Sequence, residues 1–308
     1  MAKPIFIHAG AHRTGTSSFQ MCLSQNRAAI EAAGFDLGYP GRDDIPDAQL
    51  RLALPRGDVK RQRLPIFASK ISAHLSRISP DKERGLILSE ENISGPMKHF
   101  HEGRFFPFAH KRLRALRLAL EAPPKHVVLV LRSYDELYVS AYRKRAEDNS
   151  VSDFHSLAPQ FLQIEKGWPW LVKRIREAMQ PELLTVLPYE ARGDTVDLVR
   201  LLVPALADVK LEEPKRTMNL SATDAALEAL QKRYRAGETL ARPEWQAVIA
   251  DYSAQRARTG FAEFDPAAKQ KLRDRYTGDL EWISRIPGVN YLEHGTRSKA
   301  DLGKLGAI

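Results

Sequence analysis

The feature that most constrains the fold of this chain is a short apolar segment that runs into a glycine-bounded loop and then into a helical pattern. Residues 4–8 read PIFIH, residues 10–18 read GAHRTGTSS, and a helical pattern covers about 16–33 before Gly34. Small residues let the backbone turn tightly, and the free N–H groups at the start of a helix converge where the helix dipole also favours an anion. The sequence therefore predicts a phosphate- or sulfate-binding loop after a first strand.

Three further apolar runs indicate buried strands, with helical patterns between them. The runs are 85–88 (GLIL), 126–131 (HVVLVL) and 183–187 (LLTVL), and the helical patterns include 107–121 and 136–147. Continuous apolar runs that alternate with helices are typical of parallel strands in a wound α/β sheet. We therefore predict an α/β fold like that of P-loop NTPases, with a wound, mostly parallel central sheet and flanking helices.

The domain organisation follows from the length and from two stretches that lack strand patterns. Residues 37–64 are rich in Pro, Gly, Asp and Arg, which predicts an irregular excursion from the sheet. From about residue 210 the sequence is helical and charged without clear strands. We expect a single domain over 1–308, in which 1–208 form the α/β core and 209–308 a helical cap.

The composition is that of an ordinary globular protein with an excess of basic residues. A net charge of +9 and a pI near 9.6 favour an anionic partner, which is nucleic acid, an acidic membrane surface or a small polyanionic ligand. The basic clusters are short and lie next to Asp and Glu, so most of this charge is expected on solvated helix surfaces. Cys22 is the single cysteine, and no apolar run approaches the length of a membrane span. We expect a cytoplasmic protein without integral membrane association.

The residues of the loop suit an anion that needs no metal ion. Arg13 brings a fork of N–H donors, and Thr14, Thr16, Ser17 and Ser18 bring hydroxyls. The Walker A spacing is absent, and so is its lysine. A sulfonyl group carries less negative charge than a phosphoryl group, so hydrogen bonds and one cation could replace Mg²⁺ during its transfer. A tight strand-to-helix turn with a Ser/Thr cap is the alternative.

This loop resembles the 5′-phosphosulfate-binding loop of sulfotransferases that use 3′-phosphoadenosine 5′-phosphosulfate (PAPS). The family pattern is close to G-x-x-R-[ST]-G-[ST]-[ST], and the likeness to bacterial members continues through Phe19-Gln20-Met21-Cys22-Leu23 to Gly34-Phe35. The resemblance implies that Arg13, Thr14, Gly15, Thr16, Ser17 and Ser18 bind the cofactor, that PAP is the product, and that no metal is needed. It also implies that Arg13 stabilises charge on the bridging oxygen of the leaving group.

A second segment is similar to the family's 3′-phosphate-binding element. Arg132 follows the strand pattern of 126–131, and Ser140 comes eight residues later on a predicted helix. An Arg at the carboxyl end of a buried strand faces the crevice where wound sheets bind ligands, and Ser140 can face the same anion. The sequence has Tyr134 where many members have Pro. The resemblance implies that Arg132 and Ser140 anchor the cofactor.

The segment Ser89-Glu90-Glu91-Asn92-Ile93 resembles the Ser-Ser-Glu segment that follows the corresponding strand in many bacterial sulfotransferases. An acceptor hydroxyl must lose a proton when it attacks sulfur, and a carboxylate at a strand end can take it. Glu91 is the first candidate for this general base, and Glu90 is the second. His12 is a rival, because it is next to Arg13 in the loop.

Three other segments carry weaker signals. Residues 98–104 hold two His and a Glu at a spacing that is poor for a metal, so a substrate-facing loop or plain surface is expected. Residues 168–170 (WPW) and Tyr189-Glu190 are assigned to packing. The basic tail with Arg297, Lys299 and Lys304 either frays or closes on the 3′-phosphate.

The resemblance predicts a sulfotransferase that moves a sulfonyl group from PAPS to a hydroxyl of a glycan, lipid or small molecule by in-line displacement. Three alternatives stay open: a protein that binds PAPS or PAP without transfer, a P-loop-like kinase, and a basic polyanion-binding protein. A basic stripe interleaved with aromatics is absent, so nucleic acid is not the expected partner. The sequence fixes neither the acceptor nor the oligomeric state.

Overall fold

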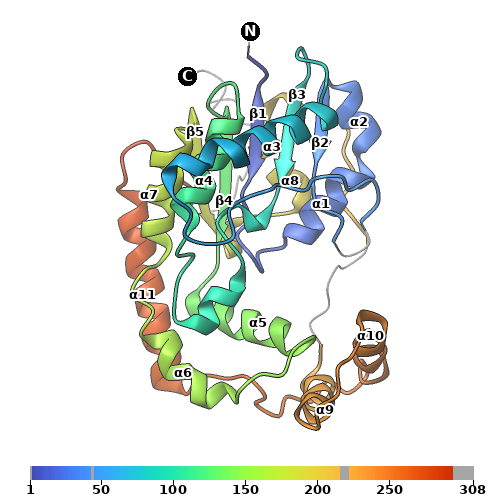
Figure 1. Cartoon of the computed structure of the whole chain (residues 1–308), viewed down its shortest axis with the longest axis vertical. Coiled ribbons are helices and arrows are strands. Elements are labelled where there is room, and N and C mark those ends of the chain that lie inside the picture. Colours follow the sequence, from blue (N-terminus) through green and yellow to red (C-terminus); the bar gives the residue numbers. More distant parts are fainter. Residues whose placement is uncertain (1, 43–44, 216–221, 294–308) are drawn as a thin grey trace.

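A computed structural model describes residues 2–42, 45–215 and 222–293, and within them the chain forms an α/β structure around one sheet (Figure 1). The sheet has six strands, all parallel, in the order β2-β3-β1-β4-β5-β6. The strands are β1 (Ile5–His8), β2 (Phe35–Gly38), β3 (Gly85–Ser89), β4 (His126–Leu131), β5 (Leu183–Pro188) and β6 (Asn290–Tyr291).

Helices flank the sheet and extend beyond its carboxyl edge (Figure 1). The α-helices are α1 (Thr16–Gln25), α2 (Arg27–Ala32), α3 (Leu64–Ile78), α4 (Ala109–Ala119), α5 (Tyr134–Ala146), α6 (Phe154–Leu162), α7 (Trp168–Met179), α8 (Thr195–Leu202), α9 (Asp224–Arg235), α10 (Arg242–Asp251) and α11 (Pro266–Ser284). Short 3₁₀ turns are η1 (Arg61–Arg63), η2 (Glu91–Ile93), η3 (Met97–Glu102), η4 (Tyr189–Ala191) and η5 (Pro204–Leu206). In the described part of the chain, none of the helices combines the length and the apolarity that a membrane crossing requires.

The central strand β4 shows how the sequence builds two cores. Its six residues are all buried, and side chains alternate across a strand. Val127 and Leu129 face one core with α3, α4 and α7, and Val128 and Val130 face the other with α1 and α8. This two-sided burial explains why the strand is a continuous apolar run.

The four predicted strands are all present, and two short ones are additional. β2 covers Phe35–Gly38, so the irregular excursion begins at residue 39 and not at 37, and α3 ends it at Leu64. β6 pairs with β5 through Thr185 and Asn290, so the expectation of a C-terminal part without strands is wrong. The predicted division into a core and a cap within one domain stays a prediction.

The helix predicted over 16–33 is two helices that meet at Asn26. The Asn26 side chain donates from Nδ2 to the carbonyl oxygens of Cys22 and Glu212, both at 2.9 Å, and its Oδ1 accepts from the Glu212 N–H at 2.7 Å. Asn side chains that bond the backbone compete with helix hydrogen bonds. The break between α1 and α2 therefore leaves the Asn26 side chain to hold the segment around Glu212, which follows α8.

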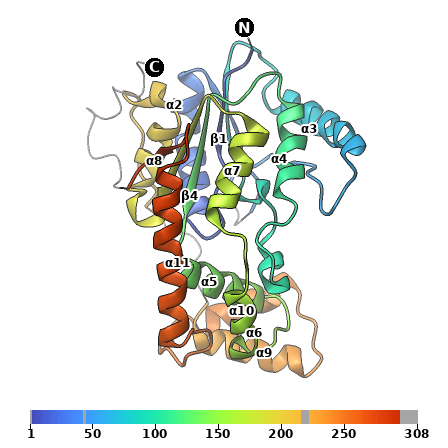
Figure 2. The ribbon, with the colours of Figure 1, turned by 90° about the vertical axis from the view of Figure 1, so that its left-hand side faces the viewer.

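The strand order places a switch point between β1 and β4. The chain leaves β1 toward β2 on one side of the sheet and leaves β4 toward β5 on the other side. Wound sheets bind ligands outside the carboxyl ends of strands at such a point. In Figure 1 this edge faces α5, with α6 and α9 beyond it, and α11 runs back beside α7 toward β6 (Figure 2).

Candidate functional site

The loop between β1 and α1 is an extension of the sheet that ends in a tight turn. The N–H groups of Ala9 and Ala11 donate to Val128 and Val130 of β4 at 2.9 and 3.0 Å, so pairing continues beyond His8. Arg13 and Gly15 then take left-handed conformations with φ of 62° and 86°. Gly15 is the N-cap of α1. The first N–H groups of α1 therefore open at the switch point, where an anion would be stabilised.

Two of the four hydroxyl groups of the loop stabilise its own backbone. The hydroxyls of Thr14 and Thr16 are buried and donate to the carbonyl oxygen of Ala11 at 2.6 and 3.1 Å. Ser17 and Ser18 lie in the first turn of α1 and are partly exposed. The loop is thus held in shape before any ligand binds, which lowers the cost of ordering it.

The two cofactor-binding segments inferred from the sequence meet here. Arg13 donates from Nε to the Ser140 hydroxyl on α5 at 2.7 Å, and Arg132 donates from Nη1 to the carbonyl oxygen of Arg13 at 2.7 Å. Arg132 is itself held by Glu136 at 3.0 Å, and its carbonyl accepts from the Trp168 indole at 2.9 Å. Residues that are more than a hundred positions apart therefore form one connected cluster.

The structure adds Arg192, which the sequence reasoning missed. Arg192 follows η4 and donates from Nη1 to the carbonyl oxygen of Thr14 at 3.2 Å. A Cβ atom on Gly15 would lie 1.8 Å from this Nη1, so the guanidinium rests directly on the loop glycine. The ring of Tyr189 lies against two guanidinium groups, with Arg192 at 4.4 Å and Arg132 at 5.3 Å from its centroid. Tyr189 is a packing residue as predicted, but it packs against the guanidinium groups of Arg132 and Arg192.

A group of acidic residues borders the loop on the side of β3. A Cβ atom on Gly10 would lie 3.0 Å from Cα and Cβ of Glu91, so the loop touches the residue predicted as the base. Arg42, from the excursion after β2, pairs with Glu90 and, at 2.8 Å, with Glu91. Arg42 was also missed, since nothing in the sequence connects it with residues nearly fifty positions later.

The hydrogen bonds around His12 fix its tautomer. Asn92 donates from Nδ2 to Glu90 at 3.2 Å, so its Oδ1 faces the Nε2 of His12 at 3.0 Å and must accept from it. Nε2 therefore carries a proton. His12 is only 3% exposed, and among the described residues Nδ1 has no hydrogen-bond partner.

The other histidines noted in the sequence belong to the interior. His99 is buried and bonds Glu102 at 2.9 Å, and His101 stacks on Tyr142 while burial lowers its pKa to about 4. The expectation of plain surface is therefore wrong for His99, while His101 is half-buried. In 2–42, 45–215 and 222–293 no three His, Cys, Asp or Glu side chains group as metal ligands would.

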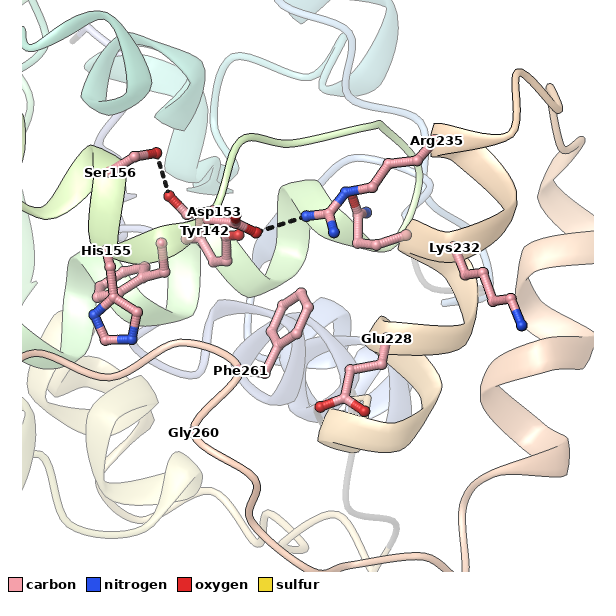
Figure 3. A pocket seen from close by; sticks show the side chains of 11 residues that line it. Tyr142, Asp153, His155, Ser156, Glu228, Lys232, Arg235, Gly260 and Phe261 are labelled. Atoms are coloured by element: carbon pink, nitrogen blue, oxygen red, sulfur yellow. Dashed lines mark hydrogen bonds and ion pairs between the residues drawn. The ribbon is translucent and has the colours of Figure 1, made fainter.

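A separate pocket of about 720 Å³ lies between α5, α6 and α9 (Figure 3). Tyr142, Phe154 and Phe261 contribute aromatic rings to it, and charged side chains surround them. Tyr142 and Ser140 are two positions apart on α5, so they do not share a face of the helix. Asp153 pairs with Arg235 at 2.7 Å. The pocket is therefore distinct from the loop cluster, and part of its charge is already neutralised.

Cys22 and the basic tail complete the list of residues singled out from the sequence. Cys22 is buried, and burial raises its pKa to about 12, so it is a poor nucleophile. Arg297, Lys299 and Lys304 lie outside the described residues.

No family model, no curated protein and no solved structure matches the chain.

Proposed function

We propose that this protein is a sulfotransferase with a P-loop-like fold that takes the sulfonyl group from PAPS and places it on an acceptor hydroxyl, releasing PAP. The observation that carries the proposal is the cluster of Arg13, Ser140 and Arg132 at the start of α1. The strand, glycine loop and helix succeed one another as in a P-loop, but without its lysine. With a single buried cysteine, the proposal places the protein in a reducing compartment such as the cytoplasm.

The cationic side of the site suits the donor. The N–H groups at the start of α1 and the guanidinium of Arg13 would bind the 5′-phosphosulfate, and Arg132 with Ser140 would bind the 3′-phosphate. The guanidinium of Arg192 donates a single hydrogen bond within the described residues, which leaves Nε and Nη2 for phosphate oxygens. Phosphate and sulfate are bound best by such forked, charge-assisted donors.

In the proposed reaction the acceptor oxygen forms a bond to sulfur while the bond from sulfur to the bridging phosphate oxygen breaks. The bridging oxygen gains negative charge as it leaves, and Arg13 with the loop N–H groups stabilises that charge. The proton of the acceptor hydroxyl passes to a carboxylate. PAP and the sulfated acceptor are the products.

Glu91 is the stronger candidate for the base. A general base must reach the acceptor, and the side chain of Glu91 is 21% exposed, whereas Nδ1 of His12 is buried. His12 and Glu90 instead hold Asn92 in place. Arg42 neutralises Glu91 in the present arrangement, so an acceptor would have to draw Arg42 away before Glu91 can take a proton.

Calorimetric titration of the metal-free protein with PAP tests the cofactor assignment. We expect micromolar or tighter binding of PAP, with weaker binding of ADP and no gain from Mg²⁺ with ATP. Arg132→Ala and Ser140→Ala should weaken PAP binding by about tenfold or more, since each removes a bond to a charged group. Arg258→Ala, at an exposed position on the loop after α10, is the matched control.

Tighter binding of ATP with Mg²⁺ than of PAP would contradict the proposal and indicate a kinase. Equal PAP affinity in the Arg132→Ala variant and in the control would show that the 3′-phosphate binds elsewhere.

Transfer itself is tested with sulfur-radiolabelled PAPS and mixtures of lipids, glycans and phenols. Once a labelled product identifies an acceptor, Arg13→Ala should lower turnover by about 10² to 10³. Glu91→Gln should lower it by about 10² while PAP affinity stays the same. Turnover that survives Glu91→Gln but is lost in His12→Gln would assign the base to His12. A protein that binds PAP but labels no acceptor would be a PAPS-binding protein without transfer activity.

A further inference from the structure

The excess positive charge of the chain is concentrated in one layer of the molecule. Residues 49–80, which contain α3 and the segment before it, hold seven Lys or Arg and one acidic residue. Residues 104–121, which contain α4, hold five Lys or Arg and one acidic residue. These two stretches carry a formal charge of +10, against +9 for the whole chain. The rest of the chain is therefore nearly neutral.

The basic residues of the first stretch are exposed and not neutralised. None of the seven forms an ion pair with any residue in the described ranges. Some cations elsewhere in the molecule are paired, as in Arg84–Asp36 and Arg143–Asp224. We call the seven residues the basic surface: Arg51, Arg56, Lys60, Arg61, Arg63, Lys70 and Arg77, all exposed.

The basic surface belongs to a well-packed part of the fold. α3 lies beside α4 on the outer side of one helical layer (Figure 2). The segment before α3 is held to α4, because Lys111 pairs with Asp58 and the buried Arg112 donates to the carbonyl oxygen of Pro55. Asp58 is the only acidic residue of 49–80, and this pairing uses it. Like charges are thus kept together on a rigid support, which costs free energy unless an anionic partner is present.

Two large apolar side chains are exposed in the same layer. Ile66 on α3 and Leu118 on α4 are each 54% exposed. Among the described residues one other large apolar side chain is exposed, Trp282, and Lys173 lies over its ring at 3.9 Å. Ile66 is close in sequence to Arg61, Arg63 and Lys70, so a bulky aliphatic side chain stands among cations.

We propose that the basic surface docks the protein on the surface of a membrane that contains anionic lipids, with Ile66 entering the interface between headgroups and acyl chains. Anionic headgroups attract Lys and Arg side chains, and an exposed aliphatic side chain gains by leaving water. Single-stranded nucleic acid fits less well, because it favours aromatic side chains for stacking. The single aromatic residue of 49–80, Phe67, is half-buried.

Vesicle flotation tests this proposal without reference to any enzymatic activity. The protein should float with vesicles of phosphatidylcholine and phosphatidylserine in equal parts, and not with vesicles of phosphatidylcholine alone. Each basic side chain near an anionic surface contributes about fivefold to partitioning, so the triple variant Lys60→Glu, Arg61→Glu, Arg63→Glu should lower the partition coefficient by at least about a hundredfold. Ile66→Ser should lower it by roughly tenfold or less, since it removes one apolar side chain.

A matched control changes the same number of charges on another part of the molecule. Arg256→Glu, Arg258→Glu, Lys271→Glu alters three exposed basic residues and should keep vesicle binding. Unchanged thermal unfolding of both triple variants shows that the fold is intact. Equal loss of binding in the two triple variants, or no binding of the natural protein to anionic vesicles, would overturn the proposal. Tight binding of a DNA duplex at a salt concentration that abolishes vesicle binding would assign the surface to nucleic acid instead.

Discussion

At the scale of single residues, the site depends on side chains that hold backbone atoms. Thr14 and Thr16 bond the carbonyl oxygen of Ala11, while Arg132 and Arg192 bond those of Arg13 and Thr14. The loop is therefore fixed from both sides by groups that do not need a ligand. Preorganised donors of this kind cost no reorganisation when charge develops on a bound group.

A comparison of Gly15→Ala with Gly34→Ala should separate the loss of stability caused by backbone strain from the loss of PAP affinity. An alanine at φ of 86° is strained by about 1–2 kcal/mol, and its Cβ would also displace Arg192 from the loop. We expect lower stability together with about tenfold weaker PAP binding, because a charged donor is moved. Gly34→Ala is the control, since Gly34 has φ of 89° and open space around it. It should lose only the stability that the strained backbone costs and keep the affinity, as measured by denaturant unfolding and calorimetry.

The residues that the sequence could identify lie in the segments that resemble known binding motifs. Arg13, Glu91 and Arg132 each come after an apolar run, and parallel strands bring their carboxyl ends to one edge. Arg42 and Arg192 come from connecting segments, whose positions depend on tertiary packing. No local sequence pattern marks these two residues, so their position in the site could not be predicted.

At the scale of elements, α5 connects the site with the rest of the fold. Ser140 faces Arg13, while Tyr134 at the start of the helix donates to Asp279 on α11 and accepts from the N–H of Trp168 at 2.7 Å. Burial raises the pKa of Asp279, and the Tyr134 hydrogen bond opposes that shift. Tyr134 is thus an anchor for two helices, α7 and α11.

Two tyrosines of α5 make a matched pair for measurement. Tyr134→Phe should destabilise the protein by about 1–3 kcal/mol, because a half-buried carboxylate and a buried N–H lose their partner. Tyr138 is equally buried, but among the described residues its hydroxyl has no partner. Tyr138→Phe is therefore expected to be neutral or stabilising in denaturant unfolding. Similar losses in both variants would show that the Tyr134 hydrogen bonds contribute little.

A continuous apolar run decided which strands the sequence could predict. β1, β3, β4 and β5 are buried apolar runs of four to six residues, and all four were found. β6 has two residues and no recognisable sequence pattern, and its pairing with β5 depends on the position of the preceding helix α11. The break at Asn26 was missed for a similar reason, because the side chain bonds a residue far along the chain.

At the scale of the whole molecule, buried histidines predict how stability responds to acid. Burial lowers the pKa of His8 to about 3, helped by Arg192, and lowers those of His101 and His126 to about 4. Unfolded histidines bind protons below about pH 6.5, while these three stay neutral in the folded state. The unfolded state therefore binds more protons, and stability should fall as the pH drops from about 6.5 toward 4.

Each histidine contributes a slope of roughly 1.4 kcal/mol per pH unit within that window. His126→Gln should reduce the measured slope by about this amount, because it removes one titrating group that is neutral when folded. His155→Gln, at an exposed position, should leave the slope unchanged. Denaturant unfolding at several pH values gives both slopes, and equal slopes in the two variants would contradict the assignment.

The position of β6 has a consequence for synthesis. Thr185 pairs with Asn290, and Leu292 donates to Val186 at 3.0 Å, so the outer edge of β5 stays open until about a hundred further residues have been made. Until then β5 offers a row of unpaired N–H and C=O groups, which is a template for association with other chains. A nascent chain that stalls within α11 would therefore aggregate more readily than one that has reached residue 292.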